Sequence, residues 1–130
     1  MDMHPEITSI LIGVADMARS KKFYAEGLGC PIENDYPQFI SFKLGDGSPA
    51  LGLYTRVALA ADAGVSPEGS GFSGVTLHHI VKSSEAVDEM MARAERAGAK
   101  IVKPAQKAGW GYFGWFSDPD GHLWKVAAGQ

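Results

Sequence analysis

The stretch at residues 110–126, WGYFGWFSDPDGHLWKV, contains the strongest structural signal in the sequence. Its Asp118-Pro119-Asp120-Gly121 segment has the composition of a tight turn, because proline presets the backbone before the bend and glycine relieves the exit. The residues on both sides are aromatic or β-branched, which is typical of strands. The stretch therefore predicts a two-stranded hairpin that turns at residues 118–121.

Successive side chains of a strand point to opposite faces of a sheet, so this hairpin sorts its bulky residues into two sets. Before the turn, Phe113 and Trp115 point one way and Phe116 points the other way. After the turn, Trp124 and Lys125 also point to opposite faces. Because both faces carry large side chains, we expect one face to meet helices and the other to wall a pocket.

The order of elements that leads to this hairpin occurs twice in the chain. Residues 75–126 contain an apolar strand, an amphipathic helix that ends at Gly98, a short strand at 101–102, a loop from Pro104 and the hairpin. Residues 7–54 repeat this order, with a helix that ends at Gly27 and Gly29 and a hairpin turn at 45–47. The sequence therefore predicts an internal duplication of a βαβββ unit.

This duplication predicts an α+β fold in one domain of 130 residues, with module 1 at about 5–55 and module 2 at about 75–128. Two such units side by side would form a curved mixed sheet with helices outside and a concave cleft, where small ligands usually bind. The linker at 56–74 begins Ala-rich and ends Gly/Ser-rich, and we expect about one helical turn in it. It is either a tether between the modules or a lid.

Composition excludes several classes of protein. The formal net charge is −3, with both signs scattered along the chain, so we expect no binding of nucleic acid. No apolar run approaches the roughly 18 residues that span a membrane. The N-terminus does not resemble a signal peptide. The single Cys30 cannot form a disulfide within the chain. We expect a cytoplasmic protein that does not bind membranes.

Motifs in both modules resemble those of a known family. They are Val14-Ala15-Asp16-Met17, Phe23-Tyr24 and Leu28-Gly29 in the first module, and Ala97-Gly98-Ala99 and the 116–124 segment FSDPDGHLW in the second. Together the chain resembles the vicinal oxygen chelate superfamily, which includes glyoxalase I, extradiol dioxygenases, fosfomycin resistance enzymes and bleomycin resistance proteins. The resemblance covers about residues 7–126. It implies the glyoxalase/bleomycin resistance fold and, because such modules often pair between chains, a homodimer.

The resemblance also implies positions for a metal ion, which His and Glu side chains hold in the family's enzymes so that it acts as a Lewis acid. In this chain those positions fall on Ser9, Gly52, Thr76 and Lys125. None of them is a His, Glu or Asp, and the ammonium of Lys125 would repel a divalent cation. We therefore expect no cofactor. A divalent metal at a displaced site around His78, which shares a face with Thr76 by strand parity, is the alternative.

The predicted ligand-binding cleft consists of inward-facing residues from both modules: Ser9, Phe39, Gly52, Tyr54, Thr76, His78, Phe113, Trp115 and Lys125. An apolar wall with one cation and one imidazole suits a planar or anionic small organic ligand. Equally, the aromatic side chains could fill the cleft or form a dimer interface. Trp110 would either close over the mouth of the cleft or cap the edge of the hairpin.

Three functions follow from these residues. The first is a metal-free small-molecule binder of the antibiotic-resistance type. The second is a divergent lyase, isomerase or dioxygenase that uses a metal site around His78, or Lys125 as an acid or base. The third is an interaction module whose cleft is vestigial. The sequence assigns no catalytic residue and does not identify the ligand.

Overall fold

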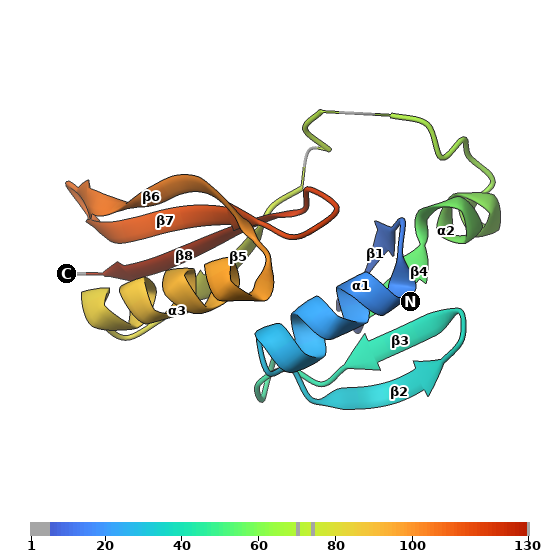
Figure 1. Cartoon of the computed structure of the whole chain (residues 1–130), viewed down its shortest axis with the longest axis horizontal. Helices are drawn as coiled ribbons and strands as arrows, with labels where there is room; N and C mark the ends of the chain where they lie inside the picture. Colours follow the sequence, from blue (N-terminus) through green and yellow to red (C-terminus); the bar gives the residue numbers. More distant parts are fainter. Residues whose placement is uncertain (1–5, 70, 74, 130) are drawn as a thin grey trace, which may run out of the picture.

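A computed structural model describes residues 6–69, 71–73 and 75–129, and it contains the duplicated unit (Figure 1). The first module consists of β1 (Ser9–Val14), α1 (Met17–Lys21), the π-helical η1 (Lys22–Gly27), β2 (Ile32–Tyr36), β3 (Phe39–Phe42) and β4 (Ala50–Thr55). The second consists of β5 (Leu77–Ile80), α3 (Ser84–Ala97), β6 (Lys100–Ala108), β7 (Gly111–Ser117) and β8 (Leu123–Gly129). The predicted α+β fold of two βαβββ modules is confirmed.

Both modules have the same sheet topology. The strand order is β1-β4-β3-β2 in one four-stranded sheet and β5-β8-β7-β6 in the other. In each sheet the first strand runs parallel to the last, and the other pairings are antiparallel. The sequence predicted one curved mixed sheet, whereas the structure has two mixed sheets. Each sheet has one face that contributes to the core and an opposite face.

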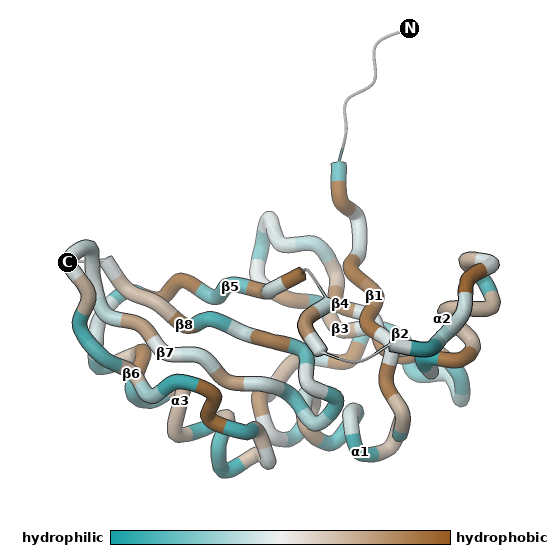
Figure 2. The backbone as a smooth tube through the Cα atoms, turned by 90° about the horizontal axis from the view of Figure 1, so that it is seen from above, coloured by the Kyte–Doolittle hydropathy of each residue, from teal (hydrophilic) through white to brown (hydrophobic). Residues whose placement is uncertain are grey.

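The linker contains more helix than the sequence predicted. Helix α2 (Arg56–Ala63) has eight residues, whereas about one turn was expected. Thr55 caps its first turn by accepting a hydrogen bond from the Ala58 backbone, and Gly64, with φ of 79°, ends it. Helix α2 lies at the end of the first module that is farther from β5–β8 (Figures 1 and 2). Residues 5, 70 and 74, within the predicted module and linker bounds, lie outside the described residues.

Strand β6 is also longer than predicted, because Pro104 does not end it. The strand continues to Ala108, with register shifts between Ile101 and Lys103 and between Lys103 and Gln106. A proline is tolerated here since β6 is the edge strand of its sheet, where one side of the backbone needs no partner. The longer strand brings Lys103 opposite Trp115.

The helix of the first module changes character midway, which allows two adjacent aromatic residues to be buried. Asp16 caps α1 by accepting from the Arg19 backbone at 3.0 Å. The chain then continues as η1, whose π-helical turns are wider, and the Leu28 backbone donates to the carbonyl of Phe23 at 2.9 Å. In this wider turn Phe23 and Tyr24 are 2% and 0% exposed. Both rings therefore belong to the core.

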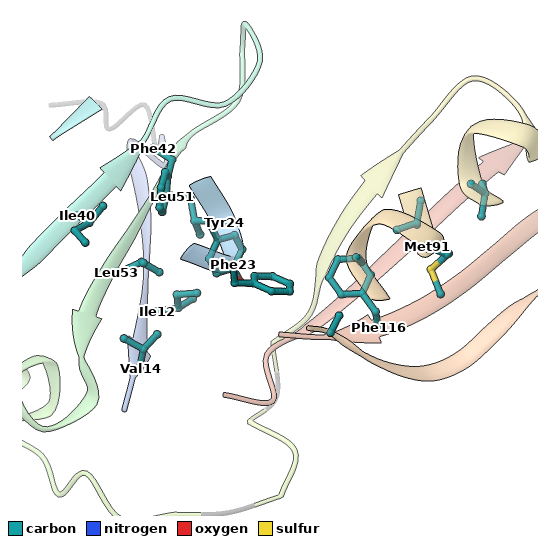
Figure 3. Close-up of a cluster of buried hydrophobic side chains, with 14 of the residues drawn as sticks. Ile12, Val14, Phe23, Tyr24, Ile40, Phe42, Leu51, Leu53, Met91 and Phe116 are labelled. Atoms are coloured by element: carbon teal, nitrogen blue, oxygen red, sulfur yellow. The ribbon is translucent and has the colours of Figure 1, made fainter. Parts of the chain in front are cut away.

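The core faces of the two sheets share one hydrophobic cluster. Phe23 and Phe116 lie side by side between the modules, with ring centroids 6.5 Å apart (Figure 3). Phe116 stacks on Trp124 at 6.1 Å, as the hairpin parity requires. A Cβ atom added at Gly27 would lie 2.4 Å from the Ala97 Cβ, so the ends of η1 and α3 are in close contact. We call the face of each sheet that points away from this cluster its outer face.

The hairpin turn of the second module holds the first module by polar contacts. Asp120 Oδ1 accepts hydrogen bonds from the Ala15 backbone at 2.9 Å and from Arg19 Nη2 at 3.0 Å. Asp120 Oδ2 accepts from Ser20 Oγ at 3.1 Å. The turn therefore closes off the start of α1, where backbone N–H groups have no partner within the helix.

Asp118 completes this connection from a buried position. It is 3% exposed, and its Oδ2 accepts from the Tyr24 hydroxyl at 2.7 Å. Its Oδ1 accepts from the backbones of Asp120 and His122 at 2.9 and 2.8 Å. The pKa of Tyr24 is raised well above its ordinary value, chiefly by burial of the phenol and further by the nearby Asp118 carboxylate. The phenol therefore stays protonated and remains a donor to Asp118.

Candidate functional site

The predicted site residues lie on the outer faces of the two sheets and form two groups. In the first sheet Phe39 pairs with Tyr54, next to Gly52 and the β1 strand that contains Ser9. In the second sheet the group consists of Thr76, His78, Phe113, Trp115 and Lys125. The two groups differ in chemistry.

The group on the first sheet is aromatic and compact. The rings of Phe39 and Tyr54 are 6.2 Å apart at an angle of 49°. Gly52 lies beneath Phe39 and Leu11, and a Cβ at this position would be 3.1 Å from both Phe39 Cε1 and Leu11 Cγ. Glycine therefore lets these two side chains approach the strand. This outer face presents rings and aliphatic carbons to its surroundings.

The group on the second sheet is built around an ammonium. Lys125 Nζ lies over the rings of Trp110, Phe113 and Trp115, at 4.5, 4.7 and 5.8 Å from their centroids. Trp110 stacks on Phe113 with centroids 5.1 Å apart and an interplanar angle of 20°. We call Trp110, Phe113 and Trp115 the aromatic cage. Cation–π attraction to these faces holds the lysine side chain over the sheet.

His78 extends the cage toward the edge of the sheet. It lies opposite Lys125 in the β5–β8 register, and its ring meets Trp115 edge-on at 5.7 Å. Its Nε2 is 3.0 Å from the Thr76 hydroxyl, and a hydroxyl can donate to or accept from an imidazole nitrogen. His78 and Thr76 therefore form a polar border to the aromatic surface.

Positive charge gathers on the second sheet although the chain as a whole is negative. Strands β5, β6, β7 and β8 contain no Asp or Glu, and their lysines are Lys100, Lys103, Lys107 and Lys125. Lys103 Nζ lies 5.5 Å from the Phe113 centroid. The ion pairs among the described residues involve Arg19 with Asp120 and Lys21 with Asp35, so neither cage ammonium is neutralised there by a carboxylate.

The residues at the metal positions do not fit a divalent ion. Ser9 and Thr76 offer hydroxyls and Lys125 offers an ammonium, while Gly52 has no side chain that could bind a metal. Within residues 6–69, 71–73 and 75–129, no group of three or more His, Cys, Asp or Glu is arranged to hold a metal. We therefore derive no chemistry through a metal ion at these positions.

Two cavities lie at the junction of the modules. One of about 470 Å³ is lined by Thr76, His78 and residues of β1 and β4. A larger one of about 580 Å³ is lined from both modules, including Cys30, Met90 and Trp124. Burial raises the pKa of the Cys30 thiol, and the Arg93 guanidinium partly offsets this. Strand parity could not reveal this cavity, because loops at 28–31 and 43–48 form one wall.

The predicted site did not include Trp110, a member of the aromatic cage, or Lys103, whose ammonium lies over Phe113. Trp110 lies in the turn between β6 and β7, where strand parity assigns no face, and its ring covers the ammonium of Lys125. Lys103 lies between the predicted short strand at 101–102 and the predicted loop from Pro104, so its alignment with Trp115 was not visible. The signal that could have found them is the density of aromatic and basic residues at 103–115.

No helix within the described part of the chain is long and apolar enough to cross a membrane. No match was found among curated proteins.

Solved structures of other proteins share this fold. The chain is similar to a glyoxalase-related enzyme from Fulvimarina pelagi, with 29% identity and a TM-score of 0.86 over 95% of this chain and 87% of that one. A glyoxalase/bleomycin resistance protein/dioxygenase family enzyme from Burkholderia phytofirmans PsJN has 21% identity and a TM-score of 0.82, over 97% and 100% of the two chains.

A lactoylglutathione lyase from Agrobacterium tumefaciens has 20% identity and a TM-score of 0.73, over 98% of this chain and 96% of that one. At 20% and 21% identity, the Agrobacterium and Burkholderia structures share the fold, which does not by itself define an activity. The family description Glyoxalase/Bleomycin resistance protein/Dioxygenase superfamily matches residues 6–126. The chain therefore belongs to the glyoxalase/bleomycin resistance protein/dioxygenase superfamily.

Proposed function

We propose that this protein binds small organic molecules without a metal ion, on the outer face of its second sheet. The observation that carries the proposal is the aromatic cage with its ammonium, three rings and a charge gathered within 5.8 Å. Flat rings supply stacking area, and the fixed charge supplies orientation. Such a surface recognises a ligand without any Lewis acid.

The exposure of the cage supports binding over simple packing. Trp110 is 53% exposed, whereas the core rings Phe23 and Phe116 are 2% and 0% exposed. A tryptophan that served only the core would be covered, because its burial stabilises the fold. Exposed apolar clusters bordered by polar groups commonly mark binding surfaces, and His78 and Thr76 supply such a border.

A homodimer would give this face a second wall. Val75, two residues before β5, and Ile80, its last residue, are 63% and 67% exposed, and Leu11 on β1 is 37% exposed. We propose that a second copy covers these side chains and encloses the ligand. Light scattering coupled to size-exclusion chromatography should give twice the mass of the 13.9 kDa chain, whereas a monomeric mass would contradict the dimer.

A second candidate is a divergent lyase or isomerase of the same superfamily. The similar Agrobacterium structure carries the name lactoylglutathione lyase. In this chain the Thr76–His78 hydrogen bond of 3.0 Å could support a proton transfer, with Lys125 nearby as a cation. The variants His78→Ala and Lys125→Ala should abolish such an activity, and turnover that survives both would exclude these residues as its centre.

Metal binding and ligand binding are tested on the same purified protein. After exposure to Ni, Zn, Mn and Fe(II) and removal of free metal, elemental analysis should find well below one ion per chain. With EDTA present, neutral 2-naphthylmethanol should still shift the indole N–H signals of Trp110 and Trp115 in NMR spectra. Trp115→Leu should weaken this binding, whereas the control Phe72→Leu, at a 70% exposed ring in the linker, should not.

Two results would contradict the proposal. One is stoichiometric metal that stays bound together with turnover of a hemithioacetal or a catechol. The other is a set of unchanged indole signals for Trp110 and Trp115 across a panel of aromatic ligands.

A further inference from the structure

We propose that the ligand of the aromatic cage is a planar aromatic anion, whose acidic group pairs with Lys125 while its ring stacks on the cage. This assignment rests on the proposed function and adds the chemical class of the ligand. It follows from the charge of the second sheet, from the arrangement of the ammonium groups and from the exposure of the cage.

The charge of the second sheet differs in sign from the charge of the whole protein. The formal net charge is −3, yet strands β5–β8 contain lysines and no carboxylate side chain. A local cluster of one sign attracts ligands of the opposite sign even when the molecule is negative overall. Of these lysines, Lys103 and Lys125 lie over Phe113 on the outer face, so the potential there favours an anion.

The ammonium of Lys125 is held in place without being neutralised. Ring faces attract it at 4.5, 4.7 and 5.8 Å, but a ring carries no net charge. Among the described residues it has no carboxylate partner. Since the side chain is already ordered over the rings, an incoming carboxylate or sulfonate gains an ion pair at a reduced entropic cost.

A second ammonium strengthens this preference. Lys103 Nζ lies 5.5 Å from the Phe113 centroid, and Lys125 Nζ lies 4.7 Å from the same centroid. An anion beside Phe113 would therefore interact with both cations. A cationic ligand would have to displace Lys125 from the rings and would still face Lys103.

The cage also favours a flat ring over an aliphatic chain. The ring planes of Trp110 and Phe113 are nearly parallel, at 20°, and the half-exposed Trp110 offers surface on which another ring can stack. Trp115 meets the edge of His78, which fixes the orientation of its own ring. Stacking supplies affinity for any flat ligand, and the ammonium groups then select the anionic one.

Three ligands of similar shape separate these contributions: 2-naphthoate, neutral 2-naphthylmethanol and cationic 2-naphthylmethylammonium. Isothermal titration calorimetry at low ionic strength gives the affinities, and the indole N–H signals of Trp110 and Trp115 locate the site. We expect 2-naphthoate to bind about tenfold more tightly than the alcohol, because one charged hydrogen bond is gained. The ammonium should bind most weakly, and added salt should reduce the affinity for naphthoate.

Variants of the lysine keep the test specific. Lys125→Met retains the aliphatic stem and should remove most of the preference for naphthoate over the alcohol, while Lys125→Arg should keep it. Lys22→Met, at an exposed lysine in η1, is the matched control and should change nothing. The NMR spectra show whether each variant is folded. If the methionine variant is not, the three-ligand comparison and its salt dependence on the wild-type protein still test the charge.

Each contrary outcome has a distinct meaning. Equal affinities for naphthoate and the alcohol at these tryptophans would overturn the anion assignment and leave the proposed binding function standing. Tighter binding of the ammonium would overturn it in favour of a cation site. Unchanged Trp110 and Trp115 signals with all three ligands would overturn both the assignment and the proposed function.

Discussion

The outer faces of the two modules have diverged on the same scaffold. In the first sheet Phe39 and Leu11 pack over Gly52, and in the second sheet an ammonium lies among three rings. The core faces are alike, because both bury apolar side chains in the one cluster that the modules share. A duplicated unit is therefore constrained where its halves must pack together and free to vary where they face outward.

The hairpin turns of the two modules differ in the same way. The turn at 45–47 carries the exposed Asp46, whereas the turn at 118–121 buries Asp118 and binds the first module through Asp120. The second turn thus joins the modules, and the first does not take part in these contacts. Matched substitutions in the two turns and on the two outer faces should therefore have unequal effects.

The largest expected effect is on the buried turn. Asp118→Ala should lower the free energy of unfolding by about 3–5 kcal/mol, since it removes a buried acceptor and leaves the Tyr24 hydroxyl and two backbone N–H groups without it. Chemical denaturation measures the loss. Asp46→Ala in the other turn is the control and should stay within about 0.5 kcal/mol of the wild type. Equal losses in both variants would break the comparison between the turns.

The next largest effect concerns Gly27, the last residue of η1, and Gly98, which follows α3. Gly27→Ala places a Cβ 2.4 Å from the Ala97 Cβ and should cost about 1–3 kcal/mol, which Ala97→Gly should largely restore. At Gly98 the backbone φ of 110° itself favours glycine, so Gly98→Ala should also destabilise the protein but without rescue by Ala97→Gly. Thermal unfolding of the single and double variants checks this. Rescue at both positions would contradict the two separate causes.

A smaller effect distinguishes the outer faces by ligand binding. Trp115→Leu should weaken the binding of 2-naphthoate by about tenfold or less, because one stacking surface is lost. Phe39→Leu on the first sheet should change it by less than about twofold if each face acts alone. Calorimetry on both variants measures this. A large effect of Phe39→Leu would show that the first sheet, from the same or a second copy, forms part of the site.

The smallest effect is confined to alkaline pH. Because burial and Asp118 raise the pKa of Tyr24 above its ordinary value of 10.0, folding favours the neutral phenol. The resulting stability is present below pH 10 and is lost as pH rises towards the folded-state pKa. Denaturation midpoints measured from pH 8 to 11 should therefore fall more steeply for the wild type than for Tyr24→Phe. Parallel curves would show that Tyr24 does not ionise on unfolding in this range.

The fold could be predicted from the sequence because its signals are local. The turn residues at 118–121 and the period of two in the flanking strands placed Phe113, Trp115 and Lys125 on one face. Repetition of the same element order then indicated the two modules. Errors arose where context overrides a local rule: Pro104 sits in an edge strand, and Thr55 and Gly64 bound a helix in a segment read as linker.

The sequence by itself determined the repeat, the sorting of side chains to the two faces of each sheet and the absence of metal-binding side chains at the positions that the family resemblance indicated. Only the tertiary structure decided that Trp110 and Lys103 lie beside the same aromatic surface as Lys125. It also decided that Asp118 and Asp120 bind the first module through hydrogen bonds. Periodicity depends on neighbours along the chain, whereas these groupings bring together residues from different strands and modules. Their positions are set by how the sheets pack around Phe23 and Phe116.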